Sequence, residues 1–326
     1  MSNPDRDPDE LTCTAAGAAG VEVMTPREVP LGGPRAMSVR RTLPQRQRSL
    51  VGAWCFVDHY GPDPVAESGG MRVPPHPHTG LQTVSWLFTG EIEHRDSAGH
   101  HAMVRPGEVN LMTAGHGISH SEVSTAATTT LHGAQLWVAL PDAARDTAPA
   151  FTHHAPDPVS GDGWEARVFL GSLLGVTSPV PAFSPLVGAE LLLEPGTVLE
   201  LDVDPEFEHG VLVDAGAISL AGVAVAPHEL AFQPAGSSTL VVHAGPDPVR
   251  LLVLGGEPFA EPIVMWWNFV GRSHDEIAGF REEWQAQLGP DGLRDGRFGV
   301  PVDDPLPPLP APALPNARLR ERGAPR

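Results

Sequence analysis

The sequence predicts a mainly β protein built from two similar antiparallel domains. Thirty-five glycines and thirty-six prolines are spread over 326 residues and separate short apolar runs, which is typical of brief strands joined by tight turns. Two stretches of the chain resemble each other weakly, which indicates a duplicated domain. Only one segment has apolar residues at helical spacing, so we expect little helix.

The predicted strands are apolar runs bounded by turn residues. They are 81–88, 108–112, 131–140, 167–173, 197–203, 229–233 and 249–254. The predicted helix follows them, because Ser273 and Glu276 have the spacing of a capping box and Gly289 with Pro290 would end a helix. The apolar residues at helical spacing between them are Ile277, Phe280, Trp284 and Leu288.

The internal repeat divides the chain into two halves. "LFTGEIE" from Leu87 parallels "LVDAGAIS" near Val213, and "PGEVNLMTAG" from Pro106 parallels "PHELAFQPAG" from Pro227. The segment 141–163 between them has no strand pattern. We therefore expect a flexible leader over 1–18, a metal-binding domain over 19–145, a linker over 146–163, a second domain without metal ligands over 164–290 and a proline-rich tail over 291–326.

The tail has its own pattern. Residues 301–315 alternate proline with apolar residues, as in a polyproline II segment. Such a tail could contact an aromatic groove on a partner, but an extended packing arm or a disordered end needs no partner and is the preferred interpretation.

Composition excludes several functions. The net charge is −19, and all 21 basic residues are arginine, so nucleic-acid binding, anionic-membrane binding and lysine chemistry are not expected. Cys13 and Cys55 are the only cysteines, and Cys13 lies in the predicted leader, so we expect no disulfide. Without a signal sequence or a long apolar run, the protein should be cytoplasmic.

A histidine cluster predicts a metal centre in the first half. Nine of the fifteen histidines lie between His59 and His132. His76 and His78 are one residue apart, so on a strand they share a face, and His120 and Glu122 repeat this spacing. Three imidazoles and one carboxylate suit Fe, Mn, Co, Ni, Cu or Zn better than Ca or Mg. Turn histidines beside a proline-rich loop are the alternative for the first pair alone.

Other polar and aromatic residues near these motifs receive weaker assignments. We expect His94, His100 and His101 at the surface of a hairpin, and His116 either at the cavity mouth or in solvent. Gln82 and Met112 could lie near the cavity or in the core, with no preference between the two. Core packing is expected for Trp54, Phe56, Trp86 and Trp137, and one of Trp266 and Trp267 should face the contact between the halves.

The second half lacks the same ligands. In the register of the repeat, Asp202 and Asp204 replace His76 and His78, while Val241 and His243 replace His120 and Glu122. A weak site for a hard cation is conceivable at the two aspartates. Solvated carboxylates at a strand end are the preferred interpretation.

The two motifs together resemble the pirin family, a branch of the bicupins. "PPHPHTGLQTVSWLFTGEIEHRDSAG" and "RPGEVNLMTAGHGISHSE" carry the resemblance, and "EPIVMWWNFVGRSHDEI" is similar to the C-terminal region of bacterial pirins. The resemblance covers roughly residues 20–290. It implies an all-β fold of two tandem cupin-type antiparallel β-barrels with a short C-terminal helix. It also implies the metal ligands that spacing selects, namely His76, His78, His120 and Glu122.

The resemblance further implies quercetin 2,3-dioxygenase activity with Fe(II), or with Mn, Co, Ni, Cu or Zn in its place. The expected partners are a small aromatic substrate and dioxygen. One departure concerns the position four residues after the second histidine, where many pirins have glutamate and this chain has Gln82. Because an amide cannot act as a base, we expect Glu122 to be the catalytic base.

Two alternatives to the enzyme hypothesis stay open. The first is an iron-containing regulatory module that binds a protein partner without turnover, as eukaryotic pirins are thought to do as transcriptional co-regulators. The second is a purely structural metal, although a chain of this length has enough core to fold without one.

Overall fold

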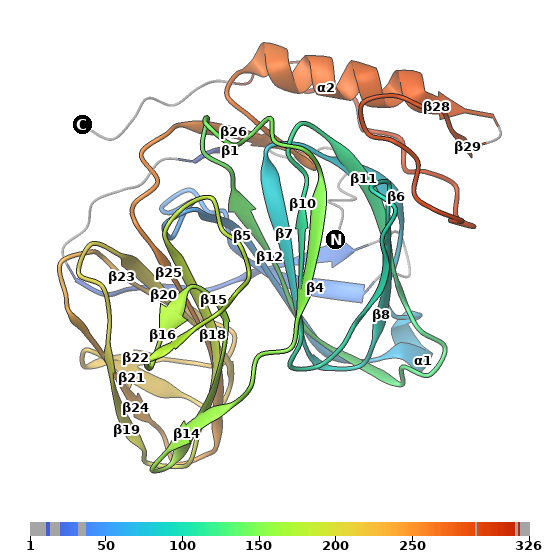
Figure 1. Ribbon diagram of the computed structural model, residues 1–326. Helices are drawn as coiled ribbons and strands as arrows, with labels where there is room; N and C mark the ends of the chain where they lie inside the picture. The colour runs from blue at the N-terminus through green and yellow to red at the C-terminus, as the bar shows by residue number, and fades with distance from the viewer. Residues whose placement is uncertain (1–10, 14–19, 32–36, 291, 317–318, 320–326) are drawn as a thin grey trace.

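The computed structural model describes residues 11–13, 20–31, 37–290, 292–316 and 319 of the chain. Antiparallel strands form two domains that lie side by side, with the helix α2 (His274–Gln287) across the N-terminal one (Figure 1). A single helical turn, α1 (Val65–Ser68), is the other helix of the described part. The predicted fold class is therefore confirmed.

The N-terminal domain consists of two sheets. The larger has the order β13-β10-β7-β12-β5-β4-β3, and the smaller has the order β6-β11-β8-β9. Their strands are β3 (Arg27–Leu31), β4 (Met37–Leu43), β5 (Trp54–Pro64), β6 (Arg72–His78), β7 (Leu81–Thr89), β8 (Ile92–Asp96), β9 (His101–Val104), β10 (Val109–Thr113), β11 (Ile118–Ser124), β12 (Thr130–Ala139) and β13 (Ala150–His154).

The C-terminal domain repeats this architecture. Its larger sheet has the order β14-β15-β18-β25-β20-β23-β2, and its smaller sheet has the order β19-β24-β21-β22. The strands are β2 (Glu22–Met24), β14 (Val159–Gly161), β15 (Trp164–Leu170), β18 (Leu186–Leu193), β19 (Val198–Asp202), β20 (Glu208–Ala215), β21 (Ile218–Leu220), β22 (Val223–Val225), β23 (Leu230–Gln233), β24 (Thr239–Ala244) and β25 (Val249–Gly256), with a small hairpin of β16 (Ser172–Leu173) and β17 (Val176–Thr177). Duplication of the domain is thus visible in the sheet orders.

The two larger sheets share one hydrophobic core. Trp86 stacks on Phe169 of the other domain with ring centroids 4.6 Å apart, and the Trp54 indole donates a hydrogen bond of 3.1 Å to the Gly255 carbonyl. The core prediction for both tryptophans is therefore confirmed. The strand β2 strengthens the junction, because it precedes the N-terminal domain in sequence but pairs with β23 of the C-terminal one.

The C-terminal helix begins as its capping box predicts. The Ser273 hydroxyl accepts a hydrogen bond from the Glu276 backbone N–H at 3.2 Å. The helix covers a small sheet of β1 (Leu11–Cys13), β26 (Ile263–Trp266) and β27 (Phe269–Gly271) and is followed by the hairpin β28 (Leu288–Gly289) and β29 (Gly292–Leu293). Trp266 and Trp267 are both buried, at 1% and 5% exposure, so the expectation that only one faces inward is wrong. Trp267 lies in the turn between β26 and β27, where strand alternation does not apply.

The proline-rich tail packs on the protein in its described part. The Trp284 indole donates to the Leu309 carbonyl at 2.8 Å, and the Leu309 N–H donates to the Pro75 carbonyl at 2.8 Å. This arrangement matches the packing-arm interpretation, and it connects helix α2 to β6, the strand of the histidine pair.

Several segments have structure that their composition did not indicate. The segment expected as a linker contains β13 and β14, and residues 11–13 of the expected leader pair with β26. Residues 1–10 and 14–18 of that leader lie outside the described residues. The exact bounds of the two domains therefore stay a prediction.

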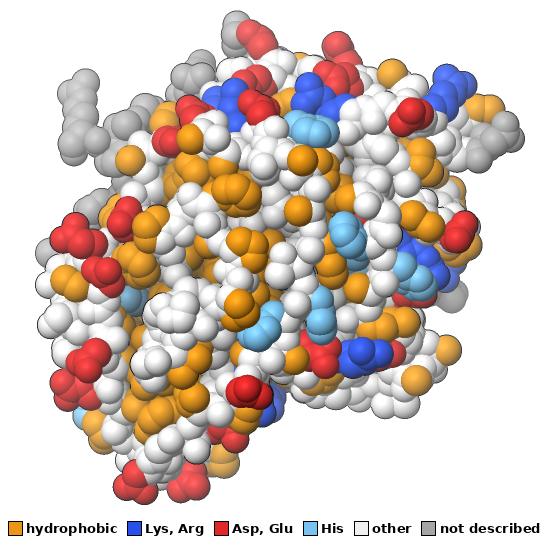
Figure 2. Space-filling view, in the orientation of Figure 1, with side chains coloured by type: hydrophobic (Ala, Val, Ile, Leu, Met, Phe, Trp, Pro, Cys, Tyr) orange, Lys and Arg blue, Asp and Glu red, His pale blue; other side chains and the backbone are white. Residues whose placement is uncertain are grey.

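Two observations bear on the excluded functions. On the face shown in Figure 2, arginine side chains are scattered among acidic ones and do not gather into a basic patch. Within the described residues, no helix has both the length and the apolar character needed to cross a bilayer. Cytoplasmic location stays a prediction.

Candidate metal centre

The four predicted ligands lie on two neighbouring strands. β6 and β11 are antiparallel partners, and their register places His76 opposite His120. His78 shares the face of His76 because strand side chains alternate. The ring centroids of His76, His78 and His120 lie 4.4 to 5.0 Å apart, and the register shifts between His120 and Glu122. The antiparallel pairing thus brings together residues separated by more than forty positions.

The three imidazoles have the protonation state that binding of a metal ion requires. His76 Nδ1 lies 2.9 Å from the Pro74 carbonyl and His78 Nδ1 lies 3.0 Å from the Asn268 carbonyl. Because a carbonyl only accepts, both Nδ1 atoms carry the proton and both Nε2 atoms present a lone pair. Burial lowers the pKa of all three imidazoles well below the usual range, so they are neutral at pH 7.

The Nε2 atoms of these imidazoles test whether a metal ion fits the site. All three are buried and have no hydrogen-bond partner among the described residues. Leaving three buried acceptors unsatisfied would cost free energy, whereas one divalent ion would satisfy all of them. The donor set of three neutral imidazole nitrogens therefore fits a borderline transition ion.

Glu122 supplies the carboxylate beside them. It is fully buried, and its donor oxygen belongs with donor nitrogens of His94 and His120 to a group within 4.8 Å. The Ser85 hydroxyl lies 3.4 Å from Glu122 Oε1 and 2.8 Å from Gln135 Oε1. Ser85 and Gln135, on β7 and β12, therefore form the wall of the barrel next to this carboxylate.

His94 corrects one expectation. It was expected at the surface, but it is 3% exposed and lies on β8 beside the centre. His94 Nδ1 lies 3.4 Å from His120 Nδ1, and its Nε2 lies 3.3 Å from the Asp96 carboxylate. In the sequence, Ile92, His94 and Asp96 alternate with Glu93 and Arg95. This alternation placed His94 on the face of apolar Ile92 and could have identified it as buried.

The other loop and hairpin histidines lie farther out. His101 is exposed and pairs with Glu93 at 2.7 Å, as a surface residue should. His100 is half-buried, because its ring stacks on Phe151 and its Nδ1 is hydrogen-bonded to the Asp96 carboxylate. His116 is exposed, which decides between its two alternatives in favour of solvent.

Gln82 does not face the ligands. Its amide donates to Thr113 Oγ1 at 3.0 Å across the β7–β10 pair. Ser85, three positions along β7, contacts Glu122, so alternation places Gln82 on the opposite face of the strand. Met112 is also buried in the core that both domains share. For both residues the core alternative therefore holds.

Aromatic groups line the barrel beside the histidines. Phe56 stacks on Trp137 at 4.0 Å between ring centroids, and Trp137 meets the His78 ring edge-on at 5.1 Å. Trp137 Nε1 and the Tyr60 hydroxyl are buried and have no hydrogen-bond partner in the part of the chain that the structure describes. Burial, with the charges of Glu122 and Asp58, raises the pKa of Tyr60, so its hydroxyl stays protonated. No sequence pattern indicated Tyr60, because Glu122, whose charge acts on it, lies on a strand distant along the chain.

The second barrel is filled with hydrocarbon. Leu199, Leu201, Leu240 and Val242 are buried in its core. Asp202 and Asp204 are exposed, as expected of solvated carboxylates at a strand end. The described residues of this barrel contain no cluster comparable with the four of the first.

Comparison with known proteins agrees with this geometry. Residues 36–138 match the protein family described as Pirin, and residues 188–288 match the family described as Pirin C-terminal cupin domain. A protein of Pseudomonas aeruginosa named "Putative quercetin 2,3-dioxygenase" is 44% identical over 85% of this chain and 89% of its own length. The chain belongs to the pirin family.

Two further pirin relatives extend the comparison. The crystal structure titled quercetin 2,3-dioxygenase from Acinetobacter baumannii superposes with a TM-score of 0.84 at 38% identity, covering 92% of this chain and 98% of that one. Human pirin is 30% identical over 63% of this chain and 73% of its own. Members of the pirin family typically bind a metal ion, and the buried histidines described above suit that property.

Proposed function

We propose that this pirin is an Fe(II)-dependent dioxygenase of the quercetin 2,3-dioxygenase type, which opens the ring of a flavonol or a related enolizable aromatic. The observation that carries the proposal is the convergence of three Nε2 atoms, none of which has a hydrogen-bond partner within the described ranges, beside a buried carboxylate. The 44% identity to a protein named as such a dioxygenase supports the same reaction class.

In this proposal His76, His78, His120 and Glu122 hold the ion. Four protein ligands leave about two positions open on an ion that prefers six. When bound, the ion would supply Lewis acidity toward a substrate oxygen, and a redox-active ion such as Fe(II) would also supply an electron for the reaction with dioxygen. Fe(II) is preferred, and Mn, Co, Ni, Cu or Zn are the alternatives to be distinguished by elemental analysis.

The protein's own groups bind and deprotonate the substrate. Phe56 and Trp137 offer a flat apolar wall beside His78, which suits an aromatic ring. Glu122 accepts the proton of the substrate hydroxyl at a carboxylate oxygen, and the Ser85 hydroxyl orients that carboxylate. Gln82 takes no part, because its side chain is engaged with Thr113 on the other face of β7.

The test of the proposed function is a direct assay. Protein loaded anaerobically with Fe(II) should consume dioxygen and release an equal amount of carbon monoxide when quercetin is added in air. A screen of flavonols and catechols on the same oxygen electrode extends the assay to other substrates. Full iron loading with no oxygen uptake on any of them would refute the dioxygenase proposal.

A prediction follows for Trp137, whose indole N–H has no hydrogen-bond partner among the residues that the structure describes. If this N–H donates to a substrate oxygen, Trp137→Phe removes one hydrogen bond and raises KM by roughly 3- to 10-fold. Steady-state kinetics with quercetin measure the change. Iron content should stay equal to that of the parent, because Trp137 is not a proposed ligand. A variant with unchanged KM would exclude this contact.

His94 carries a second prediction. His94 holds His120 through Nδ1, and residues that orient metal ligands typically contribute 10- to 100-fold in affinity. We therefore expect His94→Ala to weaken Fe(II) or Co(II) binding by about 10- to 100-fold. Competition with a chelator measures the dissociation constant. The exposed His101 on the next strand is the matched control, and His101→Ala should bind like the parent.

A further inference from the structure

A second group of ligand-type side chains lies between the two domains. His59 on β5 and His132 on β12 come from the N-terminal domain, and Asp214 on β20 comes from the C-terminal one. Asp214 Oδ1 lies 2.7 Å from His59 Nε2 and 2.6 Å from His132 Nε2. All three residues are buried, and their donor atoms lie within 4.8 Å of one another.

A fourth residue, His228, approaches this cluster. Its ring centroid lies 5.2 Å from that of His59, and the residue is half-buried, with a buried Nδ1 that has no hydrogen-bond partner in the described part of the chain. His228 also has a φ of +74°, held by a hydrogen bond of 2.7 Å from its N–H to the Val213 carbonyl. Left-handed non-glycine residues cost free energy and concentrate at functional sites. The turn before β23 thus holds an imidazole against the junction at some cost.

We propose that His59, His132 and Asp214 form a second metal site that joins the two domains, with the half-buried His228 turning inward to supply the fourth ligand. Three nitrogens and one oxygen suit a tetrahedral ion such as Zn(II). Ligand atoms around such an ion lie about 3.3 Å apart, so each histidine must retreat from Asp214 by roughly 0.6 Å. The proton on each Nε2 moves to Nδ1 as the ion binds, so no other reactant is needed.

The protonation states favour a cation. Burial lowers the pKa of His59 to about 4, so this imidazole is neutral at pH 7. Although burial pushes the pKa of Asp214 upward, hydrogen bonds from His132 and His59 hold it well below its usual value. The Asp214 carboxylate and a neutral His59 imidazole would therefore meet the ion.

Two arginines adjust the charge around the cluster. Arg250 lies 3.4 Å from Asp214 Oδ2 and 3.2 Å from Glu190 Oε1, so two carboxylates balance it. Arg40 Nε lies 3.4 Å from His59 Nδ1, and its positive charge disfavours a cation there. The Arg40 guanidinium also donates to the Gly61 carbonyl, so Arg40 keeps a partner when its long contact to His59 breaks. Removing the Arg40 charge should consequently tighten the second site.

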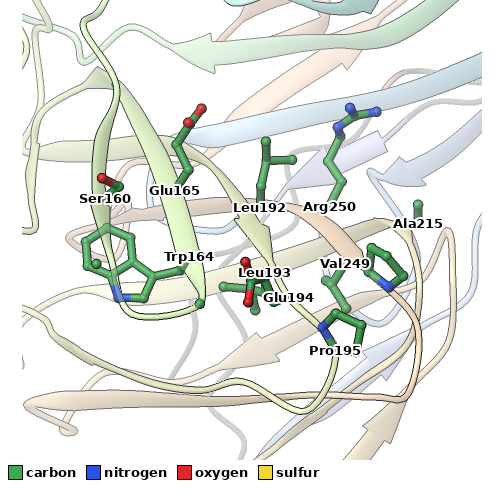
Figure 3. Close-up of a pocket in the computed structure, with 13 residues that line it drawn as sticks. Ser160, Trp164, Glu165, Leu192, Leu193, Glu194, Pro195, Ala215, Val249 and Arg250 are labelled. Carbon is green, nitrogen blue, oxygen red and sulfur yellow. The ribbon is translucent and has the colours of Figure 1, made fainter.

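A pocket lies beside the cluster at the domain boundary. It has a volume of about 380 Å³ and is lined by Phe88, Glu190 and Arg250 among others, and the Phe88 ring lies 4.9 Å from that of His132. A neighbouring pocket of about 550 Å³ shares Arg250, which Figure 3 shows on the side opposite Trp164. The approach to His132 from the first pocket thus leads past the Phe88 ring.

The experiment counts ions with the first centre removed. The double variant His76→Ala/His120→Ala should retain one equivalent of Zn(II) after dialysis, and its Co(II) form should show the intense visible absorption of a tetrahedral ion. Adding His132→Asn to this background keeps a hydrogen-bonding side chain next to Asp214 but should remove the bound ion. Adding His243→Ala, which alters an exposed histidine, should leave it. Circular dichroism establishes that each variant is folded.

Two results would overturn the second site. One is a folded double variant that retains no Zn(II), because Asp214 would then be only a hydrogen-bonded anchor between the domains. The other is an ion that persists after His132→Asn, which would place it elsewhere. Arg40→Gln supplies a further readout, since the affinity for Zn(II) should rise by about 10-fold once one opposing charge is gone.

Discussion

His120→Ala should abolish both metal binding and oxygen uptake. His120 lies opposite His76 in the β6–β11 pair, and its Nε2 is one of the three buried nitrogens without a partner. Because the loss of an orienting neighbour alone typically costs 10- to 100-fold in metal affinity, the loss of a ligand should cost at least about 100-fold. Elemental analysis after dialysis and an oxygen electrode with quercetin measure the two effects.

The control for this variant comes from the same motif. His116 precedes His120 by four residues but is exposed, so His116→Ala should keep both the metal and the activity. A His120→Ala protein that is folded, holds a full equivalent of metal and turns over as fast as the parent would contradict the proposed centre. If it holds the metal but fails to turn over, His120 is not a ligand and the assignment of the site must change.

Arg41→Met should cost about 3–5 kcal/mol of unfolding free energy, because a buried carboxylate would lose its partner. Arg41 Nε and Nη2 donate hydrogen bonds of 2.7 and 2.8 Å to the two carboxylate oxygens of Asp58. The Arg41 and Asp58 side chains are 5% and 0% exposed. The Arg41 guanidinium also lies 4.4 Å from the Phe56 ring centroid. Chemical denaturation followed by fluorescence measures the change.

Two further variants separate burial from pairing. Arg105 makes a contact of the same 2.7 Å with Glu91, but the side chains are 52% and 31% exposed. Arg105→Met should therefore cost less than about 1 kcal/mol. The double variant Arg41→Met/Asp58→Leu removes both buried charges and should recover most of the lost stability. Equal losses for Arg41→Met and Arg105→Met would show that burial does not control the effect.

Local sequence was sufficient to predict which side chains lie together at the first proposed centre. His76 and His78 share a face of any strand because side chains alternate, and the same spacing relates His120 and Glu122. Helix α2 was equally accessible, since the Ser273 cap and the apolar spacing behind it act within a few residues. The seven predicted strands overlap β7, β10, β12, β15, β19, β23 and β25, and the repeat predicted the duplicated domain.

The partners of those residues depended on the tertiary structure. His94 looked like a hairpin surface residue, but the pairing of β8 with β11 buries it against His120. The resemblance to pirins led us to expect an acid at the position of Gln82, but the face of β7 on which Gln82 lies turns it toward Thr113. The ordering of the tail around Leu309 and the exchange of β2 into the other domain were also outside the reach of local patterns.

The same contrast separates the two proposed metal sites. The sequence alone indicates the first site. His76 and His78 are one residue apart, as are His120 and Glu122, and the two strands that carry them pair. His59 and Asp214 are 155 residues apart and belong to different domains, so no local periodicity connects them. Strand alternation and helix caps are set by neighbours along the chain, whereas burial and contact between domains are set by how whole sheets pack.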